Sequence, residues 1–347
     1  MKRSILCAGL LLLFTAILLV SCQDQPKQQL VAYRSDFQVW TMRPDGTQVT
    51  KAVDLDFATA NLKWSPDRTR IAFTVIKSPN QSSIWIANSD GSAPRQVSEE
   101  FDSISAAWLN DNVLLTGVIT DSDSPDVLPV YDDYTNYILD LQNGTMREYS
   151  RGPESVVSVP PGSRWLAWNG HLGLVLHDLD SNAWPISPEL LPTGPHAFDV
   201  SPSGDTFMVC QHSMSDDTLS GLYIATLEQD GIGEPTFAYP IEDSMCVYVR
   251  WSPDGQYVAF LDNRNILYLV DAASFSLIRS FEIGPLVESS FIWSPDSKYV
   301  VVHRHYGEPG PGPKEIARVD VETGEIVRLT KNESVEYLTD WVALPSR

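Results

Sequence analysis

Hydrophobic residues along most of the chain come in short runs that are rich in Val, Ile, Phe, Tyr and Trp. Turn-forming residues, above all Pro, Asp, Asn and Gly, separate these runs. Such runs are typical of β-strands, and Asp-Gly or Asn-Gly between two of them predicts a tight hairpin. The clearest runs are Ile71–Val75, Ile84–Ala87, Leu222–Ala225, Tyr257–Leu261, Ile266–Leu269 and Tyr299–Val302. Since no convincing helical pattern lies between them, we expect an all-β protein.

The motif Trp-Ser-Pro-Asp repeats along the chain, beginning at Trp64, Trp251 and Trp293. Weaker copies complete the series at Trp108, Ser158, Val200 and Trp341. Successive copies are 44, 50, 42, 51, 42 and 48 residues apart. This period is the one expected of the blades of a β-propeller.

Each repeat contains the parts of a four-stranded antiparallel blade. An apolar strand leads into the Trp, and the Pro-Asp turn connects it to a second strand. A third strand follows and ends in a second turn, as at Ser89–Gly91, Asn143-Gly144 or Thr323-Gly324. A fourth strand closes the unit, as in Gly324–Thr330. Four antiparallel strands joined by tight turns make one propeller blade.

The full motif Trp251-Ser-Pro-Asp-Gly255, followed by a strand and a second turn, resembles the WD40-like repeats of TolB-type propellers. The resemblance covers nearly all of residues 30–347 and is strongest in the units that begin at Trp64, Trp251 and Trp293. It implies the propeller fold. TolB also has an N-terminal α/β domain, for which the chain has no room, so partner interactions that need that domain are not implied.

The two ends of the chain predict how the ring closes. Trp341 and the residues after it supply only a first strand. The N-terminal runs Leu30–Tyr33, Gln38–Met42 and Gln48–Thr50 supply the other three strands of one blade. We therefore predict a seven-bladed β-propeller of four-stranded antiparallel blades, closed by the N-terminal strands pairing with the C-terminal strand. Because two repeats are degenerate, six or eight blades remain alternatives.

The N-terminus carries the features of an export signal. A short basic start, Met1-Lys2-Arg3, precedes sixteen uncharged and mostly apolar residues, Ile5–Val20. The following Leu19-Val20-Ser21-Cys22 resembles the lipobox of bacterial lipoproteins. The resemblance implies a signal peptide at 1–21, acylation of Cys22, a tether at 22–29 and a propeller at 30–347, held on the cell membrane or outer membrane and facing the periplasm or exterior. A plain cleaved signal and a retained anchor helix are the alternatives.

Charge limits the classes of partner. The 24 Lys and Arg against 45 Asp and Glu give a formal net charge of −21. Removal of Lys2 and Arg3 with the signal would leave 22 against 45, or −23. Such a surface repels nucleic acid and anionic lipid headgroups. A partner on an acidic face is expected to be basic or to bring a cation, although the acidity also serves solubility.

Two cysteines would remain after cleavage and acylation, Cys210 and Cys246. An exported compartment permits a disulfide. Small buried thiols are the alternative, because two cysteines alone form no disulfide framework.

Three long loops between second and third strands are the candidate binding loops, at Gly117–Asn136, Gln211–Ser220 and His303–Lys314. They fall in alternate units and would rise around one mouth of the central channel. Long loops on a rigid scaffold are common places for function. Their candidate binding residues are Asp121, Asp123, Asp126, Tyr131, Asp132, Asp133, Tyr134, His212, Asp216, Asp217, His303, Arg304, His305 and Tyr306.

The chemistry of these loops leaves alternatives open. The acidic first loop is interpreted as an ordinary solvent-exposed loop. Calcium binding is the alternative, although the loop lacks the residue spacing of an EF-hand. His303 and His305 are two residues apart on one strand face, and a metal site would need a third ligand such as His212. A cationic and aromatic patch for a carboxylate or glycan is a further interpretation, and ordinary surface is the default. We predict no cofactor and no metal.

The recurrent tryptophans are predicted to pack blade against blade rather than to bind ligand. The strand residues Trp40, Trp85, Trp165 and Trp168 are assigned to the core, and Trp184 stays undetermined.

No Gly-x-Ser-x-Gly nucleophile motif, phosphate loop, haem site or cysteine zinc site occurs in the sequence. The sequence therefore favours a non-enzymatic, lipid-anchored protein-binding or scaffold module. The alternatives are a propeller enzyme of the metal-assisted lactonase, lyase or glycosidase type, with a site at the channel mouth, and a cell-surface carbohydrate-binding module.

Overall fold

The structure is a computed structural model, and it describes most of the chain from Gln28 to Leu344. The described residues are 28–101, 103–119, 134–151, 154–157, 164–169, 173–178, 184–185, 197–211, 220–228, 231–241, 244–305, 314–330 and 337–344. Within these ranges no helix is long and apolar enough to cross a membrane.

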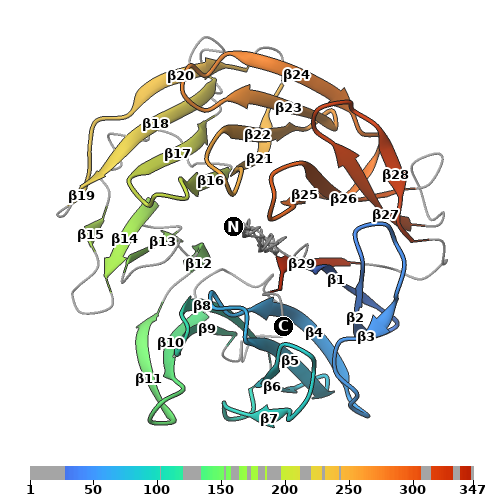
Figure 1. Ribbon diagram of the computed structural model, residues 1–347. Coiled ribbons are helices and arrows are strands. Elements are labelled where there is room, and N and C mark those ends of the chain that lie inside the picture. Colours follow the sequence, from blue (N-terminus) through green and yellow to red (C-terminus); the bar gives the residue numbers. More distant parts are fainter. Residues whose placement is uncertain are drawn as a thin grey trace, which may run out of the picture.

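The described residues form seven antiparallel sheets arranged as blades around a central axis (Figure 1). In each blade the first strand named below lies innermost. Blade 1 holds β4 (Ala58–Trp64), β5 (Arg70–Ser78), β6 (Gln81–Asn88) and β7 (Arg95–Gln96). Blade 2 holds β8 (Ser103–Asn110), β9 (Val113–Ile119), β10 (Tyr134–Asp140) and β11 (Thr145–Arg151). Blade 3 holds β12 (Glu154–Val157), β13 (Arg164–Asn169), β14 (Gly173–Asp178) and β15 (Trp184–Pro185).

The remaining blades repeat this order. Blade 4 holds β16 (Ala197–Val200), β17 (Thr206–Gln211), β18 (Gly221–Glu228), β19 (Gly231–Ile232) and β20 (Thr236–Pro240). Blade 5 holds β21 (Cys246–Trp251), β22 (Tyr257–Asp262), β23 (Ile266–Asp271) and β24 (Leu277–Glu282). Blade 6 holds β25 (Leu286–Trp293), β26 (Tyr299–His305), β27 (Lys314–Asp320) and β28 (Ile326–Arg328). The closing blade holds β29 (Tyr337–Ala343), β1 (Gln29–Ser35), β2 (Gln38–Met42) and β3 (Thr50–Lys51).

The ring closes as the sequence predicts. The C-terminal strand β29 lies beside β1, red next to blue in Figure 1, and Trp341 pairs with Val31 across the two strands. The described sheets number seven, so the alternatives of six or eight blades are wrong. A ring closed in this way has no open seam between its first and last blades at which strand edges could pair.

The hydrophobic core lies between the blades. One cluster joins Ile84 of blade 1 to Trp108 of blade 2, and another joins Phe260 of blade 5 to Met208 of blade 4. Middle strands such as β22 are buried along nearly their whole length. Both faces of a blade are therefore covered by neighbours, which is why these strands read as continuous apolar runs rather than as an alternating pattern.

The repeated motif holds each inner turn in place. In blade 5, Ser252 Oγ donates a hydrogen bond to Asp254 (2.6 Å) and accepts one from the Tyr257 amide (2.9 Å). Ser294 repeats both bonds in blade 6. The tryptophans pack between blades as predicted, since Trp108 Nε1 donates to the carbonyl of Lys63 in the preceding blade (3.0 Å). The motif is therefore structural.

Cys210 of β17 and Cys246 of β21 form a disulfide bond, so the alternative of two buried thiols is wrong. The two Cα atoms are 5.9 Å apart, and the cysteines are 36 residues apart in sequence. Because β17 and β21 belong to neighbouring blades, the bond links blade 4 to blade 5.

Two details differ from the sequence prediction. Blade 4 carries five strands, because β20 pairs with β18 beside the short β19. The three long loops are shorter than predicted: β9 runs on to Ile119, β17 to Gln211 and β26 to His305. Strand pairing extends these hairpins beyond the apolar runs because backbone hydrogen bonds do not depend on side-chain polarity.

Candidate binding surfaces

Most residues predicted for the long loops lie outside the described residues. These are Asp121, Asp123, Asp126, Tyr131, Asp132, Asp133, His212, Asp216, Asp217 and Tyr306, and the lipidation site Cys22 also lies there. Tyr134 is the first residue of β10. The described part of the chain holds no group of three potential metal-binding side chains, and calcium in the acidic loop stays a prediction.

His303 lies on β26 and is fully buried, so its assignment to a surface loop is wrong. Its ring makes an edge contact with Tyr337 at 5.5 Å between centroids, across the boundary between blade 6 and the closing blade. Burial lowers the pKa of His303 to about 4, and electrostatic interactions with Lys314 and His305 act in the same direction. The imidazole is therefore neutral at pH 7, and neither ring nitrogen has a hydrogen-bond partner among the described residues.

Arg304 is held inside blade 6 rather than offered to a ligand. Its Nε lies 2.9 Å from Oε1 of Glu315, and Arg328 Nε lies 2.9 Å from Oε2 of the same carboxylate. Glu315 is buried, and Arg304 also donates to the carbonyl of Ile283 (3.1 Å). A buried carboxylate needs such partners to offset its lost hydration. The predicted cationic patch is thus partly a structural ion-pair network.

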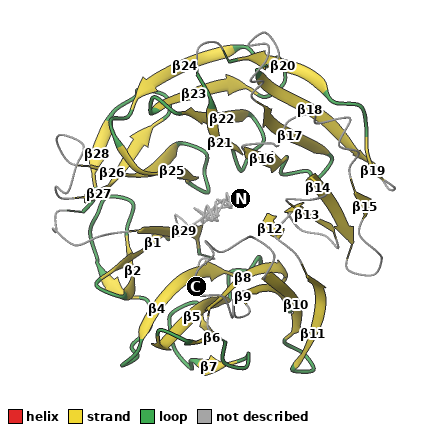
Figure 2. Ribbon diagram, turned by 180° about the vertical axis from the view of Figure 1, so that it is seen from behind, coloured by secondary structure: helices red, strands yellow, loops and turns green. Residues whose placement is uncertain are grey.

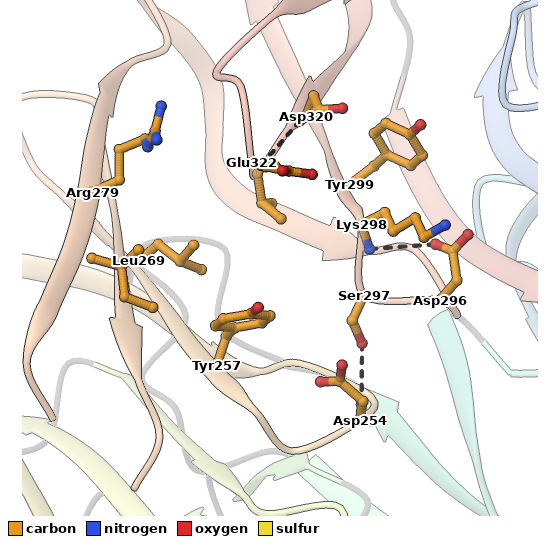
Figure 3. Close-up of a pocket in the computed structure, with 12 residues that line it drawn as sticks. Asp254, Tyr257, Leu269, Arg279, Asp296, Ser297, Lys298, Tyr299, Asp320 and Glu322 are labelled. Atoms are coloured by element: carbon orange, nitrogen blue, oxygen red, sulfur yellow. Dashed lines mark hydrogen bonds between the residues drawn. The ribbon is translucent and has the colours of Figure 1, made fainter. Parts of the chain in front are cut away.

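A groove of about 620 Å³ opens between blades 5 and 6, on the face that carries the Pro-Asp turns (Figure 3). That face is opposite to the one predicted from the long loops. The groove is lined by Asp254, Tyr257, Leu269, Ile278, Arg279, Asp296, Ser297, Lys298, Tyr299, Asp320, Val321 and Glu322. Arg279 lies on one side of the groove, and Lys298 and Asp296 lie on the other.

The groove carboxylates are fixed by the turns that carry them. Burial acts to raise the pKa of Asp296, but hydrogen bonds from Ser294, Gln29 and the Lys298 amide outweigh it and keep the pKa below its usual value. Burial likewise opposes the hydrogen bonds to Asp320 from Thr323 and the Glu322 amide, and its pKa is again lowered. Both groups are therefore ionised at neutral pH and rigidly placed.

The cations of the groove remain available to a ligand. Arg279 and Lys298 are exposed, and within the described ranges neither forms an ion pair. Tyr299 is held firmly, with the Arg318 guanidinium 4.3 Å from its ring centroid on blade 6 and Trp341 stacked at 6.5 Å. The groove can therefore bind a ligand of mixed charge with some apolar surface.

Two half-buried carboxylates on inner strands, Asp199 and Asp340, are structural. Burial raises the pKa of Asp340 and of Asp199. Asp340 accepts a hydrogen bond from the amide of Trp64 in the next blade (3.0 Å), and Asp199 accepts one from the amide of Trp251 (2.8 Å). Perturbed carboxyl groups often mark active sites, but each of these joins one blade to the next.

Sequence reasoning missed the groove because many of its residues belong to the short repeated turns, whereas loop length pointed to the opposite face. Asp254 and Asp296 occupy the same position of two repeats, 42 residues apart. The sequence signal for the groove was the presence of charged residues directly after a repeated motif, such as Lys298.

No protein-family model matches the chain, and no curated protein sequence matches it. Many solved structures share its fold. TolB from Acinetobacter baumannii is 12% identical with a TM-score of 0.53, over 92% of this chain and 67% of TolB. A candidate 6-phosphogluconolactonase from Bacteroides fragilis is 15% identical with a TM-score of 0.56, over 91% and 97%. A protein of unknown function from Desulfotomaculum acetoxidans is 11% identical with a TM-score of 0.58, over 90% and 99%. At these identities the likeness shows the β-propeller fold alone.

Proposed function

We propose that this chain is an exported, lipid-anchored β-propeller that binds a protein partner without catalysing a reaction. The observation that carries the proposal is the groove between blades 5 and 6. It offers fixed carboxylates, available cations and apolar side chains on a rigid wall, which suits recognition of a folded or extended protein surface.

The chemistry of the groove supports binding rather than catalysis. General acid catalysis needs a group that still carries its proton near neutral pH, which usually requires a raised pKa. The pKa values of Asp296 and Asp320 are lowered instead, and their oxygens are occupied by turn hydrogen bonds. The described carboxyls with a raised pKa, Asp199 and Asp340, are bonded to backbone amides between blades.

The disulfide supports export. Disulfides persist in oxidising compartments such as the periplasm and are rare in the cytosol. The bond between Cys210 and Cys246 therefore agrees with the basic start, the apolar stretch and Cys22 at the N-terminus. Lipid on Cys22 would hold the propeller a few residues from the membrane surface.

Anchoring is tested by fractionating cells that produce the full chain or its Cys22→Ser variant. We expect the wild type in the membrane fraction and the variant in the soluble exported fraction, because two acyl chains suffice for stable anchoring. Membrane retention of the variant would contradict the lipid anchor.

Binding is tested by capturing envelope proteins with the anchored wild type and with the charge reversal Arg279→Glu/Lys298→Glu. Arg95→Glu, an equally exposed change on the outer strand β7, is the matched control. The proposal predicts a partner retained by the wild type and the control but lost from the double variant. Turnover of a sugar lactone by the purified wild type, abolished by a groove variant, would instead favour an enzyme of the kind named for the Bacteroides structures.

A further inference from the structure

The hairpin between β1 and β2 turns on an unusual pair of residues. Ser35 pairs with Gln38, so the loop consists of Asp36 and Phe37 alone. Both have left-handed backbone conformations, with φ of +50° and +61°. Two-residue hairpins of this kind favour Asn-Gly, because glycine has no Cβ to clash at positive φ. A bulky residue such as Phe is strained at the second position.

Packing of the Phe37 side chain offsets little of this backbone strain. It is 70% exposed, the largest value among the exposed large hydrophobic residues of the described chain. Among the described residues its ring contacts Arg34, whose guanidinium carbon lies 5.5 Å from the ring centroid. Phe275 offers the contrast: it also has positive φ (+51°), but it is half-buried and packs edge-on against Trp251.

Phe37 is therefore unfavourable for the isolated fold in two ways, through backbone strain and through exposed apolar area. Strained residues of this kind persist mainly at functional sites, and an exposed aromatic ring is the typical anchor of a protein interface. In the free chain the Phe37 ring gains only the contact with Arg34 among the described residues, whereas a bound partner would bury it.

Two more aromatic residues lie on the same face of the molecule. Phe57 is 40% exposed and Tyr337 is 37% exposed. The segment at Phe57 is tied to the hairpin, since Gln38 Nε2 donates to the Phe57 carbonyl and the Thr59 amide donates to the Phe37 carbonyl, both at 2.8 Å. Tyr337 on β29 lies opposite Arg34 on β1. Phe37, Phe57, Tyr337 and Arg34 are called the Phe37 patch below.

Charge around the patch indicates the chemistry of the partner. Asp36, Asp54 and Asp56 are exposed in the segments that carry Phe37 and Phe57, and the whole chain carries −21. Lys51 lies 4.0 Å from Asp54 and offsets part of this negative charge. Lys or Arg side chains on a partner would meet these carboxylates and the faces of the Phe rings. An acidic partner would be repelled.

We propose that the Phe37 patch is a docking surface for a basic segment of a partner protein, one that carries an apolar anchor beside Lys or Arg. This inference rests on the proposed function, because it assumes that the partner is a protein. It adds a second contact surface on the face opposite the groove.

The position of the patch relative to the N-terminus leaves it accessible. Strand β1 starts at Gln29 on the Pro-Asp turn face and reaches the hairpin seven residues later, a span of about 20 Å. An anchor at Cys22 would join the propeller at Gln29, so the Phe37 patch would point away from the membrane.

The test uses a displayed library of random peptides, selected on the wild-type propeller and counter-selected on Phe37→Gly. We expect selected peptides to have net positive charge and one aromatic or aliphatic anchor. Their affinity should fall about tenfold or more in Phe37→Gly and weaken at high salt. Val49→Ser, which removes a residue 48% exposed near the opposite face, is the matched control and should change nothing.

A stability measurement separates a binding role from a structural one. Phe37→Gly relieves the strained turn, so its Tm should be at least that of the wild type and up to about 2 °C higher. A fall in Tm together with lost binding would overturn the inference, because Phe37 would then support the fold. Phe37→Asn, which tolerates positive φ, should lose binding in the same way.

The remaining outcomes distinguish this inference from the proposed function. The docking surface would be overturned if the selection enriched acidic or uncharged peptides, or no peptides at all. It would also be overturned if Phe37→Gly abolished dimerisation of the propeller or its binding to lipid vesicles. If the groove variants still lose their captured partner, the proposed function stands without this surface. If neither surface retains a protein, both are wrong.

Discussion

At the scale of single residues, His303 shows how burial sets the protonation state of a side chain. It is buried at the boundary where the ring closes, and burial is the main cause of its lowered pKa. A neutral imidazole packed against Tyr337 is compatible with this apolar boundary, whereas an imidazolium is not.

The consequence is a loss of stability in mild acid. The unfolded chain binds a proton at His303 near pH 6.5, whereas the folded chain binds it only near pH 4. Stability therefore falls as the pH drops through this window, by about 2 kcal/mol between pH 7.5 and pH 5. Urea unfolding of the wild type and His303→Phe at both pH values measures the difference. Equal pH dependence in the two proteins would show that His303 is not the cause.

Ser252 shows what the repeated motif contributes at one residue. Its buried hydroxyl bridges Asp254 and the Tyr257 amide, so Ser252→Ala leaves the part-buried Tyr257 amide without its acceptor. We expect a loss of about 1–2 kcal/mol in the free energy of unfolding. Ser280→Ala, on the exposed strand β24, is the control and should stay within about 0.5 kcal/mol. A similar loss in both variants would contradict the role of the turn.

At the scale of strands and blades, the sequence predicted the repeated parts and missed the singular ones. Apolar runs such as Tyr257–Leu261 predicted their strands because each lies between two neighbouring blades. The β20 strand was missed because Thr236–Pro240 is largely exposed and lacks a buried face. The groove and the Phe37 patch were missed for a related reason. A repeat pattern gives the period of the fold, but it does not show which blade boundary stays open or which turn is strained.

The disulfide links two such blades and makes a testable contribution. Removing it frees a 36-residue segment in the unfolded chain, which predicts a loss of about 2–4 kcal/mol. Reductant should lower the urea midpoint of the wild type but leave Cys210→Ala/Cys246→Ala unchanged. A wild type whose midpoint does not respond to complete reduction would contradict this contribution.

At the scale of the whole molecule, the ring depends on contacts between its first and last segments. Figure 2 shows the closing blade from behind, with β29 and β1 completing the circle. Besides strand pairing, Lys63 donates to the Thr339 carbonyl, and Arg68 donates to the Ala343 carbonyl (2.9 Å). Asp340 accepts the Trp64 amide between the same blades.

Asp340 should therefore be important for closure. Asp340→Ala leaves the Trp64 amide without its acceptor and Lys63 without its counter-charge, for an expected loss of about 3 kcal/mol. Asp340→Asn keeps a hydrogen-bond acceptor, so its loss in the free energy of unfolding should be clearly smaller than that of Asp340→Ala. Denaturant unfolding of the two variants gives the comparison, and equal losses would show that the hydrogen bond is unimportant.

The proposed function requires that the propeller bind a protein at its surface. Photocrosslinking in intact cells tests it most directly, with a photoreactive residue at Ile278 in the groove or at Phe37 in the patch, and at Val49 as the control. We expect one defined protein to be crosslinked from Ile278 and a basic segment of a protein to be crosslinked from Phe37, whereas Val49 should give no crosslink. The absence of crosslinks from both test positions in a folded, anchored protein would contradict it.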